Sequence, residues 1–317
     1  MKKVSIILAV GIFLAMTVTS TYAYEAFQGH TGVIIYDELN AENVYTLLAP
    51  GSETISYLID MEGYIVHSWD VGERPGLHDR LLDNGNLLRG YRPNVQGGYS
   101  PGIGGQAGGV REYTWDGELV WDHVAQTETS IQHHTFYRMP NGNTLILSWE
   151  YKTCAEAIAL GRDPDTCDED QGLAPDWIYE INPDQEVVWE WHVWDHLGDG
   201  PGQFDINAIT DPVVISNEDW THANTVEYDK VNDLVMTNFR NWGELFWIDH
   251  GATFVPGNPA QSIANAAGPD GEVIFRWGNP SSYGAGDPPR FNDDGDQQLF
   301  GSHCAVFLGT GDNINFD

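Results

Sequence analysis

A histidine stands at the start of a short apolar stretch four times along the chain, and each stretch runs into a turn rich in Asn, Asp and Gly. The four histidine motifs are Leu77-His78-Asp79, Gln132-His133-His134, Thr221-His222-Ala223-Asn224 and Ser302-His303-Cys304. The turns that follow them are Asn84-Gly85-Asn86, Asn141-Gly142-Asn143, Val231-Asn232-Asp233 and Gly311-Asp312-Asn313. A repeated unit with a histidine at the same place in every copy predicts a ring of imidazoles around one axis.

Each histidine motif follows a stretch that predicts a β-hairpin ending in tryptophan. The stretches are residues 57–69, 112–121, 178–191 and a looser copy that ends at 273–277 after the turn Pro269-Asp270-Gly271. They alternate β-branched or aromatic residues with polar ones and turn at Asp-Gly or Asn-Pro. With the histidine strand and a partner strand such as 144–149, each unit has four strands. We therefore predict an all-β chain folded as a β-propeller, with further strands at 32–48 and one short helix after Cys154.

The two ends of the chain lead to separate expectations. Residues 1–23 combine Lys2 and Lys3, an apolar run over 4–18 and the small-residue site Thr21-Tyr22-Ala23, a pattern typical of a signal peptide. The run is too short for a membrane span. We expect a propeller domain over 24–317 in a periplasmic or secreted protein. Four units do not close a ring of blades, so we also expect a chain that is incomplete at its C-terminus.

The net charge limits the classes of partner, and the cysteines indicate the compartment in which the protein works. The chain has 14 Lys and Arg against 47 Asp and Glu, a formal net charge of −33, which argues against nucleic acid and anionic membranes as partners. Cys154 and Cys167 bracket an acidic insertion, and a disulfide between them is expected in an exported protein. Cys304 is then left as a free thiol beside His303 or as a small buried hydrophobe.

The third histidine motif predicts a receptor for an anion. In a propeller blade the innermost strand lines the central channel, so a histidine at its head faces the axis. His222 and Asn224 alternate and share one face of their strand, and a hairpin returns Arg240 toward His222. Such donors, converging on one point, can hold an oxyanion. A metal site is the rival interpretation, but no carboxylate stands at these strand positions, and Asn and Arg are poor ligands. We therefore predict no metal.

Several of these motifs resemble the bacterial arylsulfotransferase family. The resemblance is carried by Tyr57-Leu58-Ile59-Asp60 with Gly63 and Val66-His67-Ser68-Trp69, by His133-His134 before Pro140-Asn141-Gly142-Asn143, by Thr221-His222-Ala223-Asn224-Thr225-Val226 with Arg240, and by the late His303. It covers the chain from about residue 32 to the end. The His-x-Asn motif with its later Arg is its most specific part.

The resemblance implies a six-bladed propeller that moves a sulfuryl group from an aryl sulfate to a phenol through a sulfated histidine. His303 would be the nucleophile, and His222, Asn224 and Arg240 would hold the sulfuryl oxygens, with His133 or His134 nearby. His222 would also donate to the bridging oxygen and act as acid or base. The residue that follows the family's nucleophile is usually acidic, whereas Cys304 stands here. No cofactor or nucleotide donor is implied, and the partners would be phenols and aryl sulfates.

Two other functions fit a propeller, and no motif addresses the oligomeric state. One is a non-catalytic protein that presents a binding face. The other is a quinone-dependent dehydrogenase, whose blades also carry Asp-Gly…Trp hairpins, but the Ala-x-Asp-x-x-Thr-Gly docking motif of that class is not in the sequence.

Overall fold

The computed structural model describes residues 32–200, 202–208, 218–290 and 293–307. The predicted signal peptide at 1–23 and the turn at 311–313 lie outside these residues. The described residues fall into two compact units, one that ends at Thr46 and includes Tyr57–Ser68, and a larger one of Leu47–Ser56 with the described residues from Trp69 onward. Among the helices in the described ranges, none has both the length and the apolar character that a bilayer crossing requires.

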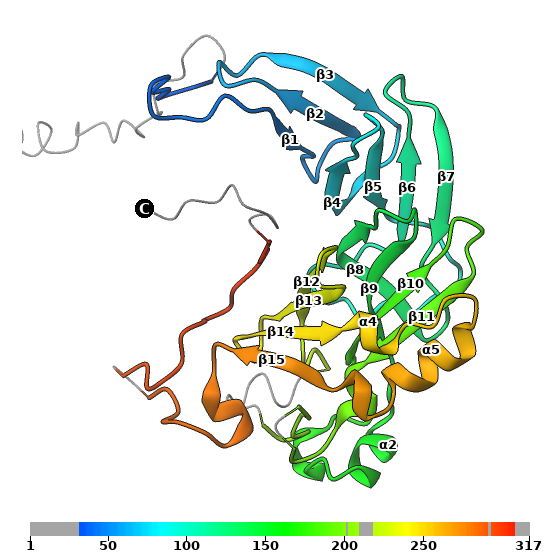
Figure 1. The fold of residues 1–317 in the computed structure, drawn as a ribbon, viewed down its shortest axis with the longest axis vertical. Coiled ribbons are helices and arrows are strands. Elements are labelled where there is room, and N and C mark those ends of the chain that lie inside the picture. The colour runs from blue at the N-terminus through cyan, green and yellow to red at the C-terminus, as the bar shows by residue number, and fades with distance from the viewer. Residues whose placement is uncertain (1–31, 201, 209–217, 291–292, 308–317) are drawn as a thin grey trace, which may run out of the picture. The chain divides into compact units, whose positions relative to one another are not determined.

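The first strands are shorter than the sequence suggested. β1 (Thr46–Leu48), β2 (Ile55–Ile59) and β3 (Ile65–Asp70) form a three-stranded sheet in that order (Figure 1). The hairpin predicted at 57–69 is confirmed as β2 and β3, with Gly63 at φ +83° in its turn, a conformation that suits glycine. The strand expected over residues 32–45 is wrong. There the Asp37 carboxylate accepts from the Leu39 N–H and the Asn40 amide, and this local turn replaces strand pairing.

Three four-stranded antiparallel sheets make up most of the larger unit. In each sheet the strands pair in chain order. The predicted grouping, in which each histidine strand joins the hairpin before it, is wrong, because each histidine strand shares its sheet with the hairpin that follows it. The first sheet is β4 (Pro75–Leu81), β5 (Leu87–Tyr91), β6 (Gly109–Tyr113) and β7 (Leu119–Val124). The second is β8 (Ser130–Arg138), β9 (Thr144–Glu150), β10 (Asp176–Ile181) and β11 (Val187–His192). The third is β12 (Ala223–Asp229), β13 (Leu234–Phe239), β14 (Glu244–Asp249) and β15 (Val273–Trp277). The prediction of an all-β fold is confirmed.

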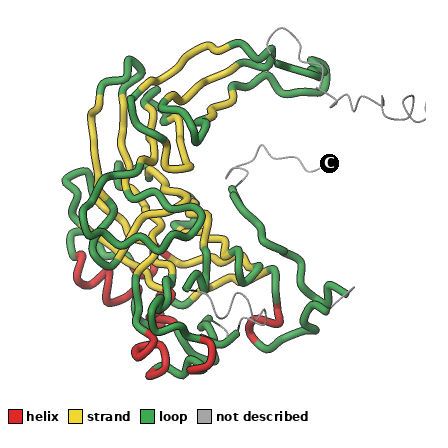
Figure 2. Tube along the Cα trace, turned by 180° about the vertical axis from the view of Figure 1, so that it is seen from behind, coloured by secondary structure: helices red, strands yellow, loops and turns green. Residues whose placement is uncertain are grey.

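Short helices occupy the insertions between strands (Figure 2). They are α2 (Cys154–Ala159), α4 (His250–Thr253) and α5 (Pro259–Ala266), with 3₁₀ turns η1 (Pro164–Thr166), η2 (Val193–His196), η3 (Pro269–Gly271) and η4 (Pro280–Tyr283). The predicted helix after Cys154 is confirmed and has a capping box between Thr153 and Glu156. The turn predicted for the looser hairpin at 269–271 is wrong. The strands β14 and β15 do pair, but α4, α5 and η3 connect them in place of an Asp-Gly turn.

The first strands of the three four-stranded sheets lie against one another. The Val226 N–H in β12 donates to Thr135 Oγ1 in β8 at 2.8 Å. Arg80 in β4 forms an ion pair with Glu227 in β12, and His78 in β4 packs edge-on against Phe136 in β8. The heads of β8 and β12 are therefore brought to one place, and this position matters for the site described below.

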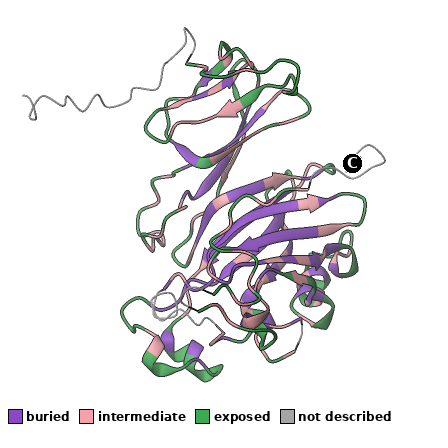
Figure 3. Ribbon diagram, turned by 90° about the vertical axis from the view of Figure 1, so that its left-hand side faces the viewer, coloured by how far each residue is buried: buried purple, intermediate pink, exposed green. Residues whose placement is uncertain are grey.

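The core is formed by strand side chains, and the exposed residues lie mostly in loops (Figure 3). The largest cluster joins the second and third sheets and includes Leu145, Ile178, Trp189, Trp191, Val226 and Phe246. Full burial of such side chains stabilises the fold by about 1.5–3 kcal/mol each. The tryptophans also anchor neighbouring segments, as when Trp191 Nε1 donates to the carbonyl oxygen of Gly271 at 2.8 Å.

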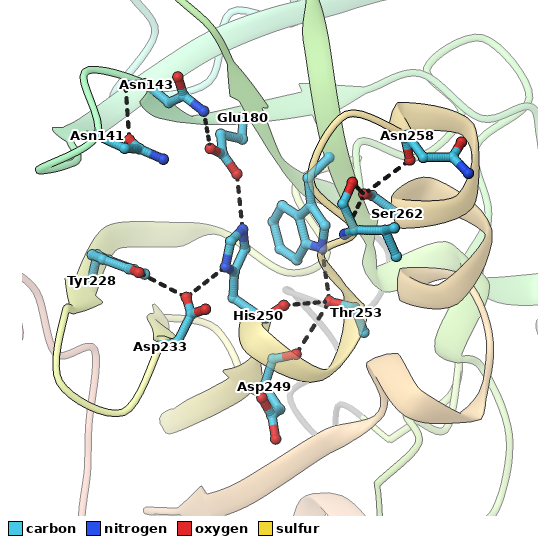
Figure 4. A network of polar contacts seen from close by, with 12 residues as sticks. Asn141, Asn143, Glu180, Tyr228, Asp233, Asp249, His250, Thr253, Asn258 and Ser262 are labelled. Carbon is cyan, nitrogen blue, oxygen red and sulfur yellow. Dashed lines mark hydrogen bonds and ion pairs between the residues drawn. The ribbon is translucent and has the colours of Figure 1, made fainter.

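A buried ionic network around His250 ties the second sheet to the third (Figure 4). His250 Nε2 lies 2.8 Å from Glu180 Oε2 in β10, and its Nδ1 lies 2.7 Å from Asp233 Oδ1. The Asn143 amide also donates to Glu180, and the Tyr228 hydroxyl donates to Asp233. Burial alone would lower the pKa of His250, but hydrogen bonds to Asp233 and Glu180 raise it to about 9. The imidazole is therefore a cation between two carboxylates at neutral pH.

The cysteines pair as the sequence predicts. Cys154 and Cys167 form a disulfide across the insertion that contains α2, and Cys304 is a free, exposed thiol. A disulfide fits an oxidising compartment, as expected of a periplasmic or secreted protein.

Candidate active site

The first strand of each four-stranded sheet departs from regular pairing at its histidine or, in β12, directly after His222, which precedes the strand. The register shifts between Pro75 and Asp79 in β4, between Gln132 and Phe136 in β8, and between Ala223 and Thr225 in β12. His134 and His222 themselves have φ values of +47° and +50°. Bulges and left-handed residues re-aim side chains and are common beside functional sites. Here they turn the two imidazoles out of the strand alternation.

Three imidazoles converge on one point. The ring centroids of His134 and His222 lie 5.0 Å apart. The ring centroid of His303 lies 6.1 Å from that of His134 and 6.2 Å from that of His222. We call these three residues the histidine cluster. The expected ring of four is wrong for His78, which packs against Phe136 in a site where burial lowers its pKa to about 4. Within the described residues His303 lies on an irregular segment and not on a strand.

The segment that carries His303 is anchored by side chains from the third sheet. The Asn224 and Asn238 amides both donate to the Ser302 carbonyl oxygen at 2.7 Å, and the Ser302 hydroxyl donates to Asn238 Oδ1 at 2.8 Å. His303 Nδ1 lies 2.9 Å from the Gly301 carbonyl oxygen. A carbonyl oxygen only accepts, so Nδ1 carries a proton, and in the neutral form of the ring the lone pair is on Nε2.

His222 is oriented by a carboxylate that the sequence analysis did not single out. Asp219 accepts a hydrogen bond from His222 Nδ1 across the turn that precedes β12. This bond fixes the tautomer and leaves Nε2 of His222 for the cluster. The spacing Asp219-x-x-His222 could have predicted this contact, because a carboxylate three residues before a histidine can reach its imidazole across a turn.

Arg240 lies next to His222, as the predicted hairpin requires. Its backbone N–H donates to the carbonyl oxygen of His222 at 3.0 Å, just beyond the end of β13. The side chain is exposed, and its guanidinium donates to Asn241 Oδ1 at 2.8 Å. Burial, the neighbouring histidines and Arg240 lower the pKa of His134 to about 2, so that imidazole is neutral. The cluster thus combines the neutral ring of His134 with one permanent cation.

The glycine-rich stretch 97–109 packs directly on His134, which the sequence analysis missed. The His134 N–H donates to the Gly105 carbonyl oxygen at 2.8 Å. Gly105 has φ +102°, and a Cβ there would lie 2.0 Å from His134 Cε1. Only glycine fits this approach, so the loop covers the imidazole closely. His133, the other predicted neighbour, lies behind His134, fully buried and stacked on Trp149 with centroids 3.7 Å apart.

The histidine cluster has the donor set of a metal site as well as that of an anion receptor. One ligand atom from each of His134, His222 and His303 lies within 4.8 Å of the others. Three imidazoles with an open fourth position suit zinc, whose nitrogen ligands stand about 2.0–2.1 Å from the ion. A cation there would also meet the field of Arg240. Arginine beside neutral imidazoles favours a tetrahedral anion, whose oxygens accept hydrogen bonds from both.

The chain was compared with known proteins. The model of a family described as Arylsulfotransferase (ASST) matches residues 34–256. The matched range contains His134, His222, Asn224 and Arg240, and it ends before His303. No curated protein matches the chain.

Proposed function

Because this chain belongs to the arylsulfotransferase (ASST) family and is an arylsulfotransferase, we propose that it moves a sulfuryl group from an aryl sulfate to a phenol through a covalent intermediate on His303. One observation carries the proposal. His303 Nδ1 is bonded to the Gly301 carbonyl oxygen, so the lone pair of Nε2 is free to attack beside two other imidazoles. No nucleotide donor takes part in this reaction.

In the first half-reaction the Nε2 lone pair of His303 attacks the sulfur of the aryl sulfate. The N–S bond forms, the S–O bond to the aryl group breaks, and the phenolate leaves with the electron pair and takes up a proton. In the second half-reaction the oxygen of an acceptor phenol attacks the same sulfur, gives up its proton and displaces the imidazole. Splitting one transfer into two in-line displacements is the advantage of a nucleophilic side chain. Because the sulfuryl group is anionic, most of the remaining catalysis is positioning and charge stabilisation.

The other predicted residues have roles that fit their positions. Arg240 supplies a permanent positive charge to the sulfuryl oxygens. His222, oriented by Asp219, donates a hydrogen bond to the bridging oxygen and so stabilises the charge that develops there. Asn224 gives one amide N–H to Ser302 and so holds the nucleophile's segment, and its second N–H is assigned to a sulfuryl oxygen. His134 lies beside His222 and His303 and lines the site.

The larger architecture and the location are part of the same proposal. Three four-stranded sheets whose first strands meet one another support a β-propeller, with six blades as the family resemblance implies. We propose a domain that begins after a signal peptide at 1–23 and works in the periplasm or outside the cell. The disulfide between Cys154 and Cys167 supports export.

The test is an assay with a chromogenic aryl sulfate and a phenol acceptor. We expect release of the coloured phenol, formation of the sulfated acceptor and ping-pong kinetics. Kinetics in which donor and acceptor must both be bound before any phenol is released would contradict a covalent intermediate.

Replacing Arg240 by leucine should lower kcat by about 100-fold. A lost oxyanion donor costs 10²–10³-fold, and the lower end applies because the Arg240 side chain is exposed. Arg240→Lys should recover part of the rate, since it keeps the charge and loses the planar fork. Steady-state kinetics measure both, and Arg290→Leu, at an exposed arginine outside the cluster, is the matched control. An unchanged kcat in Arg240→Leu would remove Arg240 from the site.

A further inference from the structure

Two fully buried polar residues stand in line behind His134 and have no part in the chemistry proposed so far. His133 Nδ1 lies 2.9 Å from His134 Nδ1, and His133 Nε2 lies 2.8 Å from Asp176 Oδ1. The side chains of His133 and Asp176 are 0% and 1% exposed. The second contact is close without meeting hydrogen-bond geometry, and neither of its two atoms has a hydrogen-bond partner among the described residues. The three groups form one continuous chain from the interior to the histidine cluster.

The surroundings hold this chain in place. The other oxygen of Asp176, Oδ2, accepts from the Thr221 hydroxyl and from the Ala223 N–H, the latter at 2.8 Å. Both donors flank His222 in the sequence, so Asp176 is fixed to the backbone beside the cluster. The His133 ring is stacked on Trp149 with an interplanar angle of 10°. Neither side chain can turn away without losing buried contacts.

We propose that Asp176, His133 and His134 form a proton wire that gives a proton to the leaving phenolate and takes one from the incoming phenol. In the loaded state Asp176 carries a proton on Oδ1 and donates to His133 Nε2. His133 Nδ1–H donates to His134 Nδ1, and His134 Nε2–H faces the substrate. The proposal rests on the function proposed above, and it names the groups that supply a proton to the leaving phenolate and accept one from the incoming phenol. Asp176 and His133 are positioning residues that act through His134.

The proton balance closes over one catalytic cycle. When the phenolate leaves, it takes the proton from His134 Nε2, His134 Nδ1 takes the proton of His133 Nδ1, and His133 Nε2 takes the proton of Asp176. The wire is then unloaded, with Asp176 as a carboxylate and both rings neutral in the opposite tautomers. When the acceptor phenol attacks sulfur, its proton enters at His134 Nε2 and the same shifts reload the wire.

The electrostatics of the interior suit a wire that never holds an imidazolium. Burial lowers the pKa of His133 well below its usual value, and burial with neighbouring positive groups lowers that of His134 to about 2. Burial raises the pKa of Asp176 to about 7, which makes its acid form accessible near neutral pH. The mobile proton therefore resides on the carboxyl end of the wire.

Asp176→Asn is the decisive variant, because asparagine copies the loaded state. Its carbonyl oxygen can accept from Thr221 and Ala223 while its NH₂ donates to His133. We expect the first half-reaction, measured as a burst of coloured phenol, to stay within a few-fold of the wild-type rate, because the acidic phenolate of a chromogenic donor leaves without needing the proton that asparagine cannot release. Transfer from the sulfated enzyme to a weakly acidic phenol should fall by about 100-fold or more, the usual size of general base catalysis. Acidic phenols, already ionised at the assay pH, should be used nearly normally.

The controls separate this proposal from a structural role and from the proposed function itself. Asp79→Asn changes another buried carboxyl, one whose pKa burial raises to about 6, and should leave both half-reactions unchanged. An equal loss in both half-reactions of Asp176→Asn, or no loss at all, would overturn the wire. Nitrogen NMR of the free, histidine-labelled enzyme needs no turnover. At a pH well below 7, where Asp176 keeps its proton, it should show His133 and His134 neutral, with protons on Nδ1 and Nε2 respectively. An imidazolium or the reverse tautomers at that pH would refute the proposal even if no sulfated enzyme can be trapped.

Discussion

Replacing His303 by alanine is expected to abolish both sulfuryl release from the donor and transfer to the acceptor. The first bond in the cycle is formed by His303 Nε2, so without it no intermediate exists for a second step. The loss should exceed that of Arg240→Leu by several orders of magnitude. Arg240 only stabilises the transition state, whereas His303 forms the covalent bond on which both half-reactions depend. Burst and steady-state measurements with a chromogenic aryl sulfate test both half-reactions.

The control for His303 is its neighbour Cys304. The thiol is exposed and is the only free cysteine among the described residues, so it is the obvious competing nucleophile. Cys304→Ser should leave kcat within about two-fold, since the backbone at φ +57° is retained and the proposed chemistry does not use sulfur. Activity that survives His303→Ala but disappears in Cys304→Ser would assign the nucleophile to Cys304.

The largest effect on stability is expected from His250→Gln. The substitution removes the cation between Glu180 and Asp233 and leaves the Glu180 carboxylate buried without its charged partner. Breaking a buried ion pair from one side costs about 3–5 kcal/mol. We expect the free energy of unfolding, measured in urea, to fall by that amount. His303→Ala should leave it unchanged, because His303 is exposed.

The same network predicts how stability depends on pH. The pKa of His250 is about 9 in the folded protein and about 6.5 in an unfolded chain. The folded state therefore binds the extra proton between these values. The stabilisation by His250 is complete below about pH 6.5 and is lost as the pH rises through 9. His250→Gln should lack this alkaline loss. A variant that retains the wild-type dependence between pH 7 and 10 would show that other groups cause it.

The strands could be predicted from the sequence because their signal is local. Alternation of β-branched and aromatic residues, broken by Glu-Gly, Asp-Gly or Asn-Pro turns, is enough to place the hairpins at 57–69, 112–121 and 178–191. The helix α5 was missed, although Asn258 caps it and Pro259 begins it. Its eight residues are too few for a clear helical period, and its docking on the sheet is a tertiary effect.

The three histidines that come together could be singled out from the sequence, but neither their arrangement nor the groups that contact them could. His133 and His134 are adjacent, so a regular strand would point one toward the axis and one away, and the sequence offers no means of choosing. The choice is made by the bulge in β8, where His134 takes a positive φ. Asp176 reaches His133 from a different strand, and Gly105 reaches His134 from a loop. Both contacts depend on strand pairing over long sequence distances, which local pattern does not specify.

The covalent intermediate on His303 is the central claim, and mass spectrometry tests it most directly. The enzyme is mixed with an aryl sulfate in the absence of acceptor, quenched under alkaline conditions that spare a nitrogen–sulfur bond, and digested. The account predicts one added SO₃ group on the peptide that contains His303, which disappears when a phenol is added before the quench. An SO₃ group on any other residue, or turnover without an adduct in a trap fast enough to capture the burst, would contradict it.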